Sequence, residues 1–304
     1  EDGDSDTVER LTALNRTAGD IAFNLTTEGG QAELDGAITY HSGNPAVATI
    51  DANGQVTIAG VGETTLMARK PGGTAAGKTY QPTEAQLRLV VEKQAQAAFS
   101  FTDINKSYGD EPFTVDPEEA RSGSGLIRYE SNNTAVATIV ADTGKVTITG
   151  VGEAIITAIK AGDSSYNEIE ATFTITVTRA EQSGFSVGGD VTKTFGNANF
   201  IQAATGGQGT GVVSYVSNNN AVATVVTDTG EITINGAGTA TITASKAGDA
   251  NYNVAEASYT LTVVKASQPA LLFAEASLSL MVGDNATNSL SGGGGTGAVS
   301  YSSD

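Results

Sequence analysis

The residues best suited to bind a ligand lie in a short motif that occurs twice. It reads Lys-Ala-Gly-Asp-x-x-Tyr-Asn and covers residues 160–167 and 246–253. Carboxylate, amide and backbone carbonyl oxygens are the hard ligands that calcium prefers. An Asp and an Asn four residues apart therefore predict a calcium site in each copy. The predicted ligands are Asp163, Asn167, Asp249 and Asn253.

The same motif also fits a purely structural turn. In that interpretation the Asp caps the turn, and Tyr166 or Tyr252 packs its ring against a β-sandwich with its hydroxyl bonded to backbone. The spacing is not that of an EF-hand, which favours the structural turn. Residues 71–73 read Pro-Gly-Gly where the copies have Ala-Gly-Asp, so at most two calcium sites are expected.

A second acidic pattern marks a turn near the start of each repeat. Three copies are Gly-Asp pairs, at residues 19–20, 109–110 and 283–284, and the fourth is Gly196-Asn197. Carboxylates at such turns could hold calcium between neighbouring domains. Asn197 interrupts the series, which weakens this hypothesis.

The inventory of reactive side chains argues against an enzyme. The chain has one histidine, His41, and no cysteine, which excludes a hydrolytic triad, a thiolate metal site and a disulfide framework. A pair of catalytic carboxylates stays open, although no two acidic residues stand out from their turn positions. A lysine–asparagine cross-link also stays open at Lys160 or Lys246, although both lysines are expected at exposed strand ends.

A glycine-rich segment at residues 206–211 superficially resembles a phosphate-binding loop. That chemistry needs glycines that open a helix, whereas these glycines lead into a predicted strand at 212–216. Related segments occupy residues 122–125 and 292–297. We expect a flexible loop at one end of each repeat, with a recognition tip as the alternative.

Charge and hydropathy exclude two classes of partner. The net charge is −18, and the 16 basic residues are scattered, so nucleic acid and anionic membrane surfaces are disfavoured. No apolar run approaches the length of a membrane span. The chain starts at Glu1 without a methionine or a signal segment, so we expect an excerpt from a longer protein.

The elements that must position these motifs repeat with a long period. Tyr40, Tyr129, Tyr215 and Tyr301 are spaced by 89, 86 and 86 residues. A period of this length suits a whole small sandwich domain per repeat. Within each repeat, apolar residues alternate with threonine-rich polar positions, which predicts strands and no helix.

The period also predicts the domain boundaries. Residues 1–10 are expected to be a leader or the tail of a preceding unit, 11–92, 93–178 and 179–264 three complete domains, and 265–304 a truncated fourth. The junctions contain no glycine or proline and are short, so we expect semi-rigid connections. We expect the truncated fourth unit to be poorly packed unless another chain supplies its missing strands.

The strongest signature is the stretch Tyr-x-Ser-x-Asn-x-Ala-Val-Ala-Thr-Ile/Val at residues 129–139 and 215–225, with the strands that follow it. It resembles the bacterial Ig-like domain of the second group, which is repeated in invasin- and intimin-type and other large bacterial surface adhesins. The resemblance covers the chain from about residue 11 onward. It implies an all-β chain of tandem immunoglobulin-like β-sandwiches arranged end to end.

The resemblance implies a non-enzymatic stalk of an adhesin that projects a distal binding domain from a bacterial surface into the extracellular space. Its partners would be the neighbouring Ig-like repeats and, through a distal domain, a host or surface receptor. The alternative is a ligand-binding module, for example a carbohydrate-directed one, or an accessory module of a secreted protein. The chain has no tryptophan and its aromatics fall mostly at inward positions, which favours the stalk.

Overall fold

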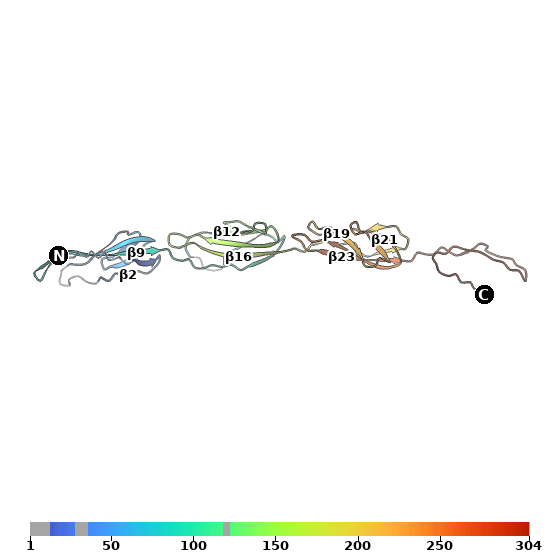
Figure 1. Cartoon of the computed structure of the whole chain (residues 1–304), viewed down its shortest axis with the longest axis horizontal. Helices are drawn as coiled ribbons and strands as arrows, with labels where there is room; N and C mark the ends of the chain where they lie inside the picture. The colour runs from blue at the N-terminus through green and yellow to red at the C-terminus, as the bar shows by residue number, and fades with distance from the viewer. Residues whose placement is uncertain (1–12, 28–35, 118–121, 304) are drawn as a thin grey trace, which may run out of the picture. The chain divides into compact units, whose positions relative to one another are not determined.

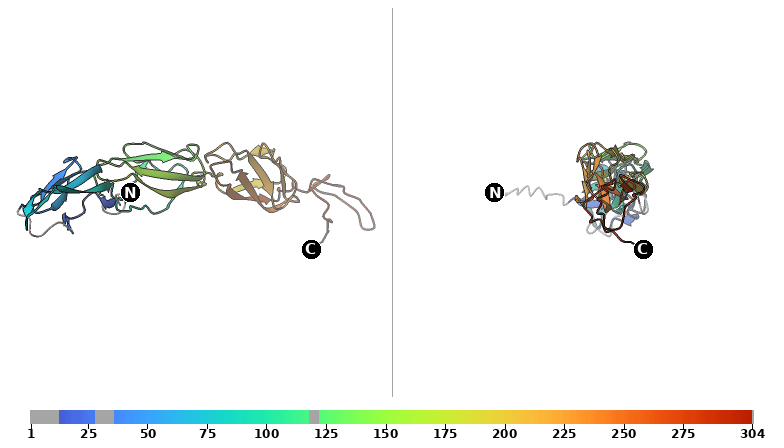
Figure 2. Two further views of the ribbon diagram at one scale, coloured as in Figure 1. Left: turned by 60° about the vertical axis from the view of Figure 1, so that its left-hand side comes forward. Right: turned by 90° about the vertical axis from the view of Figure 1, so that its right-hand side faces the viewer.

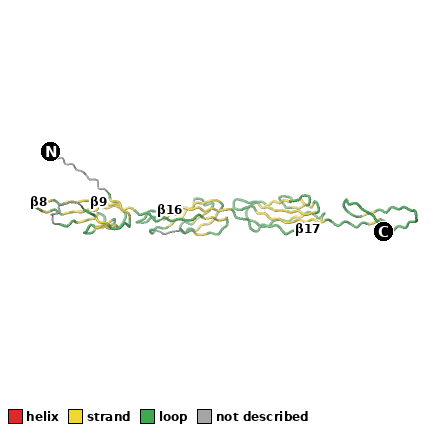
Figure 3. Tube along the Cα trace, turned by 90° about the horizontal axis from the view of Figure 1, so that it is seen from below, coloured by secondary structure: helices red, strands yellow, loops and turns green. Residues whose placement is uncertain are grey.

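The computed structural model describes residues 13–27, 36–117 and 122–303, so the predicted leader at 1–10 lies outside the described residues. Over these residues the chain forms strands and loops without a helix (Figures 1 and 3). The prediction of an all-β chain of tandem sandwiches is therefore confirmed. The chain divides into two compact units, one ending at Thr178 and one starting at Arg179.

Repeat 1, the first of two repeats in the first unit, contains strands β1 to β9. They are β1 (Leu14–Thr17), β2 (Phe23–Asn24), β3 (Thr39–Ser42), β4 (Ala48–Ile50), β5 (Gln55–Ile58), β6 (Gly62–Lys70), β7 (Gly73–Ala75), β8 (Lys78–Tyr80) and β9 (Thr83–Glu92). A four-stranded sheet in the order β1-β9-β6-β3 and a three-stranded sheet in the order β2-β5-β4 make up the sandwich.

Repeat 2 completes the first unit with the same arrangement. Its strands are β10 (Ile104–Ser107), β11 (Phe113–Thr114), β12 (Ile127–Ser131), β13 (Ala137–Ile139), β14 (Lys145–Ile148), β15 (Gly152–Lys160) and β16 (Ile169–Thr178). The sheet orders are β10-β16-β15-β12 and β11-β14-β13. The two sheets of the repeat form two layers (Figure 2).

Repeat 3 and the short repeat 4 lie in the second unit. Repeat 3 has β17 (Val191–Thr194), β18 (Phe200–Ile201), β19 (Val213–Ser217), β20 (Ala223–Val225), β21 (Glu231–Ile234), β22 (Gly238–Lys246) and β23 (Ala255–Val264), in sheets ordered β17-β23-β22-β19 and β18-β21-β20. Over its described residues, repeat 4 has two strands, β24 (Leu272–Phe273) and β25 (Leu290–Ser291). Its apolar side chains are exposed, as Met281 (82%) and Val282 (108%) show.

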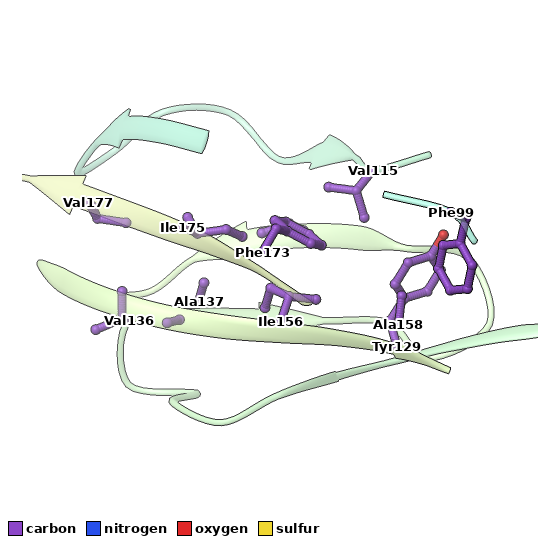
Figure 4. Close-up of a cluster of buried hydrophobic side chains, with 12 residues drawn as sticks. Phe99, Val115, Tyr129, Val136, Ala137, Ile156, Ala158, Phe173, Ile175 and Val177 are labelled. Atoms are coloured by element: carbon purple, nitrogen blue, oxygen red, sulfur yellow. The ribbon is translucent and has the colours of Figure 1, made fainter. Parts of the chain in front are cut away.

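The core of each complete repeat lies between its two sheets, because inward residues alternate with outward ones along every long strand. In repeat 2, Ile156 and Ile175 are fully buried, and Phe101 stacks on Phe173 with ring centroids 4.7 Å apart. Figure 4 shows the buried cluster to which Ile156, Phe173 and Ile175 belong, with its side chains between the ribbons. The strict alternation is what allowed the inward positions of Ile156, Phe173 and Ile175 to be predicted from the sequence.

The first and last strands of each complete repeat run parallel and side by side. Ile104 to Ser107 of β10 pair with Ile175 to Thr178 of β16, and β1·β9 and β17·β23 pair in the same way. Among the described residues, all other pairs of strands are antiparallel. The last strand is therefore an inner strand, held by the first strand on one side and by the preceding long strand on the other.

The Ser-Asn-Asn part of the signature is a hydrogen-bonding centre. Oδ1 of Asn132 accepts the N–H of Ile155 at 2.8 Å, and Nδ2 of Asn133 donates to the carbonyl oxygen of Glu153 at 3.0 Å. The same bonds recur in repeat 3. These side-chain amides join the end of β12 to the start of β15. This structural role explains why the motif recurs, and the explanation needs no ligand.

Repeat 1 has an extra hairpin that the sequence pattern did not predict. Strands β7 and β8 pair across a turn at Ala76 and Gly77, whose φ angles are +47° and +74°. Two consecutive positive φ values are typical of a type I′ turn. The hairpin occupies the position at which repeats 2 and 3 have the Lys-Ala-Gly-Asp motif.

None of the described residues belongs to a helix that is long and apolar enough to cross a membrane.

Candidate functional site

The carboxylate of Asp163 is the centre of the first copy of the motif. Its Oδ1 accepts the backbone N–H groups of Ser165 at 2.8 Å and Tyr166 at 2.9 Å. Its Oδ2 accepts the N–H of Ser124 at 2.8 Å and the hydroxyl of the same residue at 3.1 Å. Asp163 therefore closes its own turn and also binds the glycine-rich loop.

Asp249 does the same in repeat 3, with nearly identical distances. Its Oδ1 accepts the N–H groups of Asn251 and Tyr252, each at 2.9 Å. Its Oδ2 accepts the N–H of Thr210 at 2.8 Å and its hydroxyl at 3.2 Å. The two copies of the motif are thus one structural device used twice.

These hydrogen bonds favour the ionised form of both carboxyl groups. The backbone N–H of Ser124, followed by that of Ser165, lowers the pKa of Asp163 well below its usual range. The corresponding N–H groups of Thr210 and Asn251 lower the pKa of Asp249 to about 2. Both side chains are therefore anions at neutral pH, and their charge is used to hold two loops together.

The glycine-rich loops supply the room that this contact needs. A Cβ atom on Gly125 would overlap the carbonyl oxygen of Ala161 and lie 2.7 Å from its carbonyl carbon. Gly123 has φ +70°, and a Cβ there would lie 3.0 Å from the ring of Tyr166. We expected a flexible loop, but the structure ties Ser124 to Asp163 instead.

The motif also binds the segment that leads into the same repeat. In repeat 2 the N–H of Gln94 donates to the carbonyl oxygen of Ser165 at 2.8 Å, and the N–H of Asn167 donates to that of Gln94 at 2.9 Å. In repeat 3, Ala180 makes the corresponding pair of bonds with Asn251 and Asn253. We call residues 94–96 with 160–167, and residues 180–182 with 246–253, the linker latches.

A buried glutamine completes each linker latch. Nε2 of Gln96 lies 3.0 Å from the carbonyl oxygen of Ala161 and 2.6 Å from that of Asn167. Gln182 repeats this contact with Ala247 and Asn253 at 3.1 and 2.7 Å. Each glutamine is 7% exposed, and its Oε1 has no hydrogen-bond partner among the described residues.

The asparagines of the motif point their amides at the linker. Nδ2 of Asn167 donates to the carbonyl oxygen of Lys93 at 3.4 Å, and Nδ2 of Asn253 donates to Oε1 of Glu181 at 2.7 Å. In the described part of the chain, no three His, Asp or Glu side chains gather so that they could hold a metal ion. Calcium binding by Asp163, Asn167, Asp249 and Asn253 stays a prediction.

The second acidic pattern closes a turn at the end of the first strand of each complete repeat. Asp110 accepts the N–H of Ser107 at 3.0 Å, and Asn197 accepts that of Thr194 at 2.8 Å. Asp20 binds both the N–H and the hydroxyl of Thr17, and these bonds lower its pKa. An amide oxygen serves this turn as well as a carboxylate does, which explains why Asn197 is tolerated.

The environment of Lys160 differs from the predicted one. It is 3% exposed, and its Nζ donates to the carbonyl oxygen of Ser122 at 2.6 Å. Lys246 is half-buried, and its Nζ donates to the carbonyl oxygen of Gly211 at 3.1 Å. The expectation of exposed strand ends was wrong because the glycine-rich loop folds over both lysines.

Sequence reasoning missed two groups of residues in this region. Gln96 and Gln182 were not singled out, although they recur with the 86-residue period. Asp103 and Asp190 were also missed, and each accepts a backbone N–H from the last strand at 2.8 Å. A comparison of the repeats position by position would have found all four.

Each complete repeat has two sheets, and its first strand runs parallel to its last strand. Repeats of this kind in tandem define a chain of immunoglobulin-like β-sandwiches. A family model described as the intimin immunoglobulin-like domain matches residues 21–70, 118–162 and 188–248, which is half of the chain. The chain belongs to this family. Family and fold indicate an adhesin-like cell-surface protein and favour a structural or adhesive role without catalysis.

The solved structures that match the chain share little sequence with it. The first three domains of Drosophila N-cadherin have a TM-score of 0.31 and 10% identity, covering 84% of this chain and 99% of that one. A SusE-like, surface-located polysaccharide-binding protein of Bacteroides thetaiotaomicron has a TM-score of 0.26 and 16% identity, covering 75% and 43%. Likenesses at these scores support no inference about function. The comparison with curated proteins found no related sequence.

Proposed function

We propose that the chain is a spacer segment of a bacterial surface adhesin, in which tandem Ig-like sandwiches project a distal binding domain away from the cell. The observation that carries this proposal is the linker latch. Strand β16 ends at Thr178, and Ala180 is already hydrogen-bonded within repeat 3. One residue, Arg179, separates the two attachment points, and this favours a spacer over a flexible tether.

The proposed domain boundaries follow from the same observation. Lys93 and Arg179 each lie between the last strand of one repeat and the latched segment of the next. The proposed domains are 11–92, 93–178 and 179–264, with 265–304 as the start of a fourth. Each linker then belongs to the domain that follows it.

The surface of the complete repeats also supports a spacer. Among the described residues, the exposed aromatic side chains are Phe195, Phe273 and Tyr301, and only Phe195 lies in a complete repeat. A row of exposed aromatics, which a carbohydrate-directed module would need, is not found on the described residues of repeats 1 to 3. The proposed partners are therefore the neighbouring repeats, and a receptor is reached through a distal domain.

Small-angle scattering of the chain in solution tests the spacer proposal. We expect a radius of gyration well above the ~20 Å of a compact domain of this length. A variant with Gly-Ser residues inserted beside Arg179 should show a broader distribution of interatomic distances, because the inserted residues behave as flexible coil. A compact particle, or an insertion without effect on the distribution, would contradict the spacer.

A further inference from the structure

The way the chain enters repeats 2 and 3 suggests a response to tension. We propose that each linker latch is a tension-sensitive release. Pulling along the chain detaches residues 94–96 or 180–182 from the Asp-containing loop and leaves the sandwich behind them folded. This inference concerns the response of single repeats to force, and it does not depend on the spacer role proposed above.

The parallel pairing of the first and last strands determines how the sandwich carries tension. In a parallel pair, pulling the first strand toward its N-terminus and the last toward its C-terminus slides one strand along the other. The bonds between Ile104–Ser107 and Ile175–Thr178 are then loaded together instead of one after another. β16 also pairs over nine residues with β15, so the C-terminal attachment is the stronger one.

The linker latch lies upstream of that strand pair and has fewer contacts. Its backbone bonds are the two between Gln94 and the loop, and its side-chain bonds come mainly from the amide of Gln96. Tension that arrives from the N-terminal side reaches these bonds before it reaches β10. Because the smaller set of bonds is loaded first, we expect it to open first.

Two features of the latch make its opening reversible. The loop that receives the linker is closed independently by Asp163, whose bonds to Ser165 and Tyr166 do not involve the linker. Phe99 is 7% exposed and packs in the core of repeat 2, which anchors the chain immediately after the latch. Release therefore leaves both the receiving loop and the core in place, ready to bind the linker again.

Magnetic tweezers acting on the full chain test the proposal directly. Because the chain has no cysteine, a single added cysteine at each end gives unique attachment points. We expect reversible two-level changes in extension at forces below those that unfold the repeats. Each change is at most ~11 Å for the three residues 94–96, because an extended residue spans no more than about 3.6 Å.

The double variant Gln96→Leu/Gln182→Leu removes the amide donors from both latches. We expect the steps to move to lower force, because only the two backbone bonds at Gln94 or at Ala180 then hold each linker. The unfolding forces of repeats 2 and 3 should stay unchanged, because their strand pairs are intact. Gln55→Leu makes the same change at an exposed glutamine of repeat 1, and it should leave the steps as they are. A native chain without steps, or steps at unchanged force in the double variant, would overturn the proposal.

Hydrogen exchange on the native chain gives a test that needs no variant. The backbone N–H groups of Asn167 and Asn253 donate to the linker. Those of Tyr108 and Phe195 donate to carbonyl oxygens at the end of the last strand. If the latch opens separately, the first pair exchanges at least about tenfold faster than the second. Equal exchange rates would mean that latch and sandwich open as one, and the release mechanism would be wrong.

Discussion

Replacing Gly211 with alanine tests whether the glycine-rich loop must touch the Asp-containing loop. A Cβ atom there would overlap the carbonyl oxygen of Ala247 and lie 2.5 Å from its carbonyl carbon. Both are backbone atoms, so the two loops have to separate. Overpacking typically costs ~1–3 kcal/mol, and separation weakens two hydrogen bonds, one from Lys246 Nζ and one from the N–H of Ala247. We expect a loss of about 3 kcal/mol in the stability of repeat 3.

Gly189 provides the matched control in the same repeat. A Cβ added there meets nothing within 4 Å, and its φ lies outside the left-handed region. Gly189→Ala should therefore change stability by no more than about 0.5 kcal/mol. Hydrogen exchange at increasing urea, followed by mass spectrometry of peptides from β22, reports on repeat 3 separately from repeat 2. Equal effects of the two substitutions would show that Gly211 and Ala247 do not have to lie in close contact.

A double-mutant cycle identifies the mechanism of this loss. If Gly211→Ala acts by moving Thr210 away from Asp249, the variant Asp249→Asn has already lost part of the same contact. The combined effect should then be smaller than the sum of the two single effects. Additive effects would show that the alanine acts elsewhere, for example through the unfolded chain.

Three further predictions concern acid, the core and calcium. The lowered pKa of Asp249, about 2 in the folded state against about 3.9 unfolded, stabilises repeat 3 above about pH 4. That contribution is lost as the pH falls toward the folded pKa, so the stability difference between the native chain and Asp249→Asn should shrink below about pH 4 in acid-unfolding curves. Ile242 is 1% exposed, so Ile242→Ala should cost ~2–5 kcal/mol, measured by the same exchange experiment, and a loss below 1 kcal/mol would contradict the assigned core. Calcium binding at Asp163 and Asp249 predicts a melting temperature that rises with ion concentration, and identical melting in chelator and in millimolar calcium would contradict it.

The sequence allowed the sandwich to be predicted because a strand with one buried face has a side-chain period of two. Ile156 and Ile175 were predicted inward by this rule, and both are fully buried. The pairing of β10 with β16 did not follow from it, because periodicity places a residue on a face but does not say which strand lies beside it. The linker latch was missed for a similar reason. A buried glutamine such as Gln96 has no apolar signal, and its partners are backbone carbonyls that every residue carries.

The parallel pairing of first and last strands also sets the order in which a repeat can fold. Ile104 can pair with Ile175 only after the 70 residues between them have been added to the chain. The first strand of each repeat therefore stays unpaired until the final strand is present. Contacts between such distant residues slow folding, and unpaired strands are the usual starting point for misassembly. Neighbouring repeats have closely similar final strands, so the unpaired first strand of one repeat could pair incorrectly with the final strand of the next. A chain that emerges N-terminus first avoids this error, because each repeat can fold before the competing final strand of the following repeat appears.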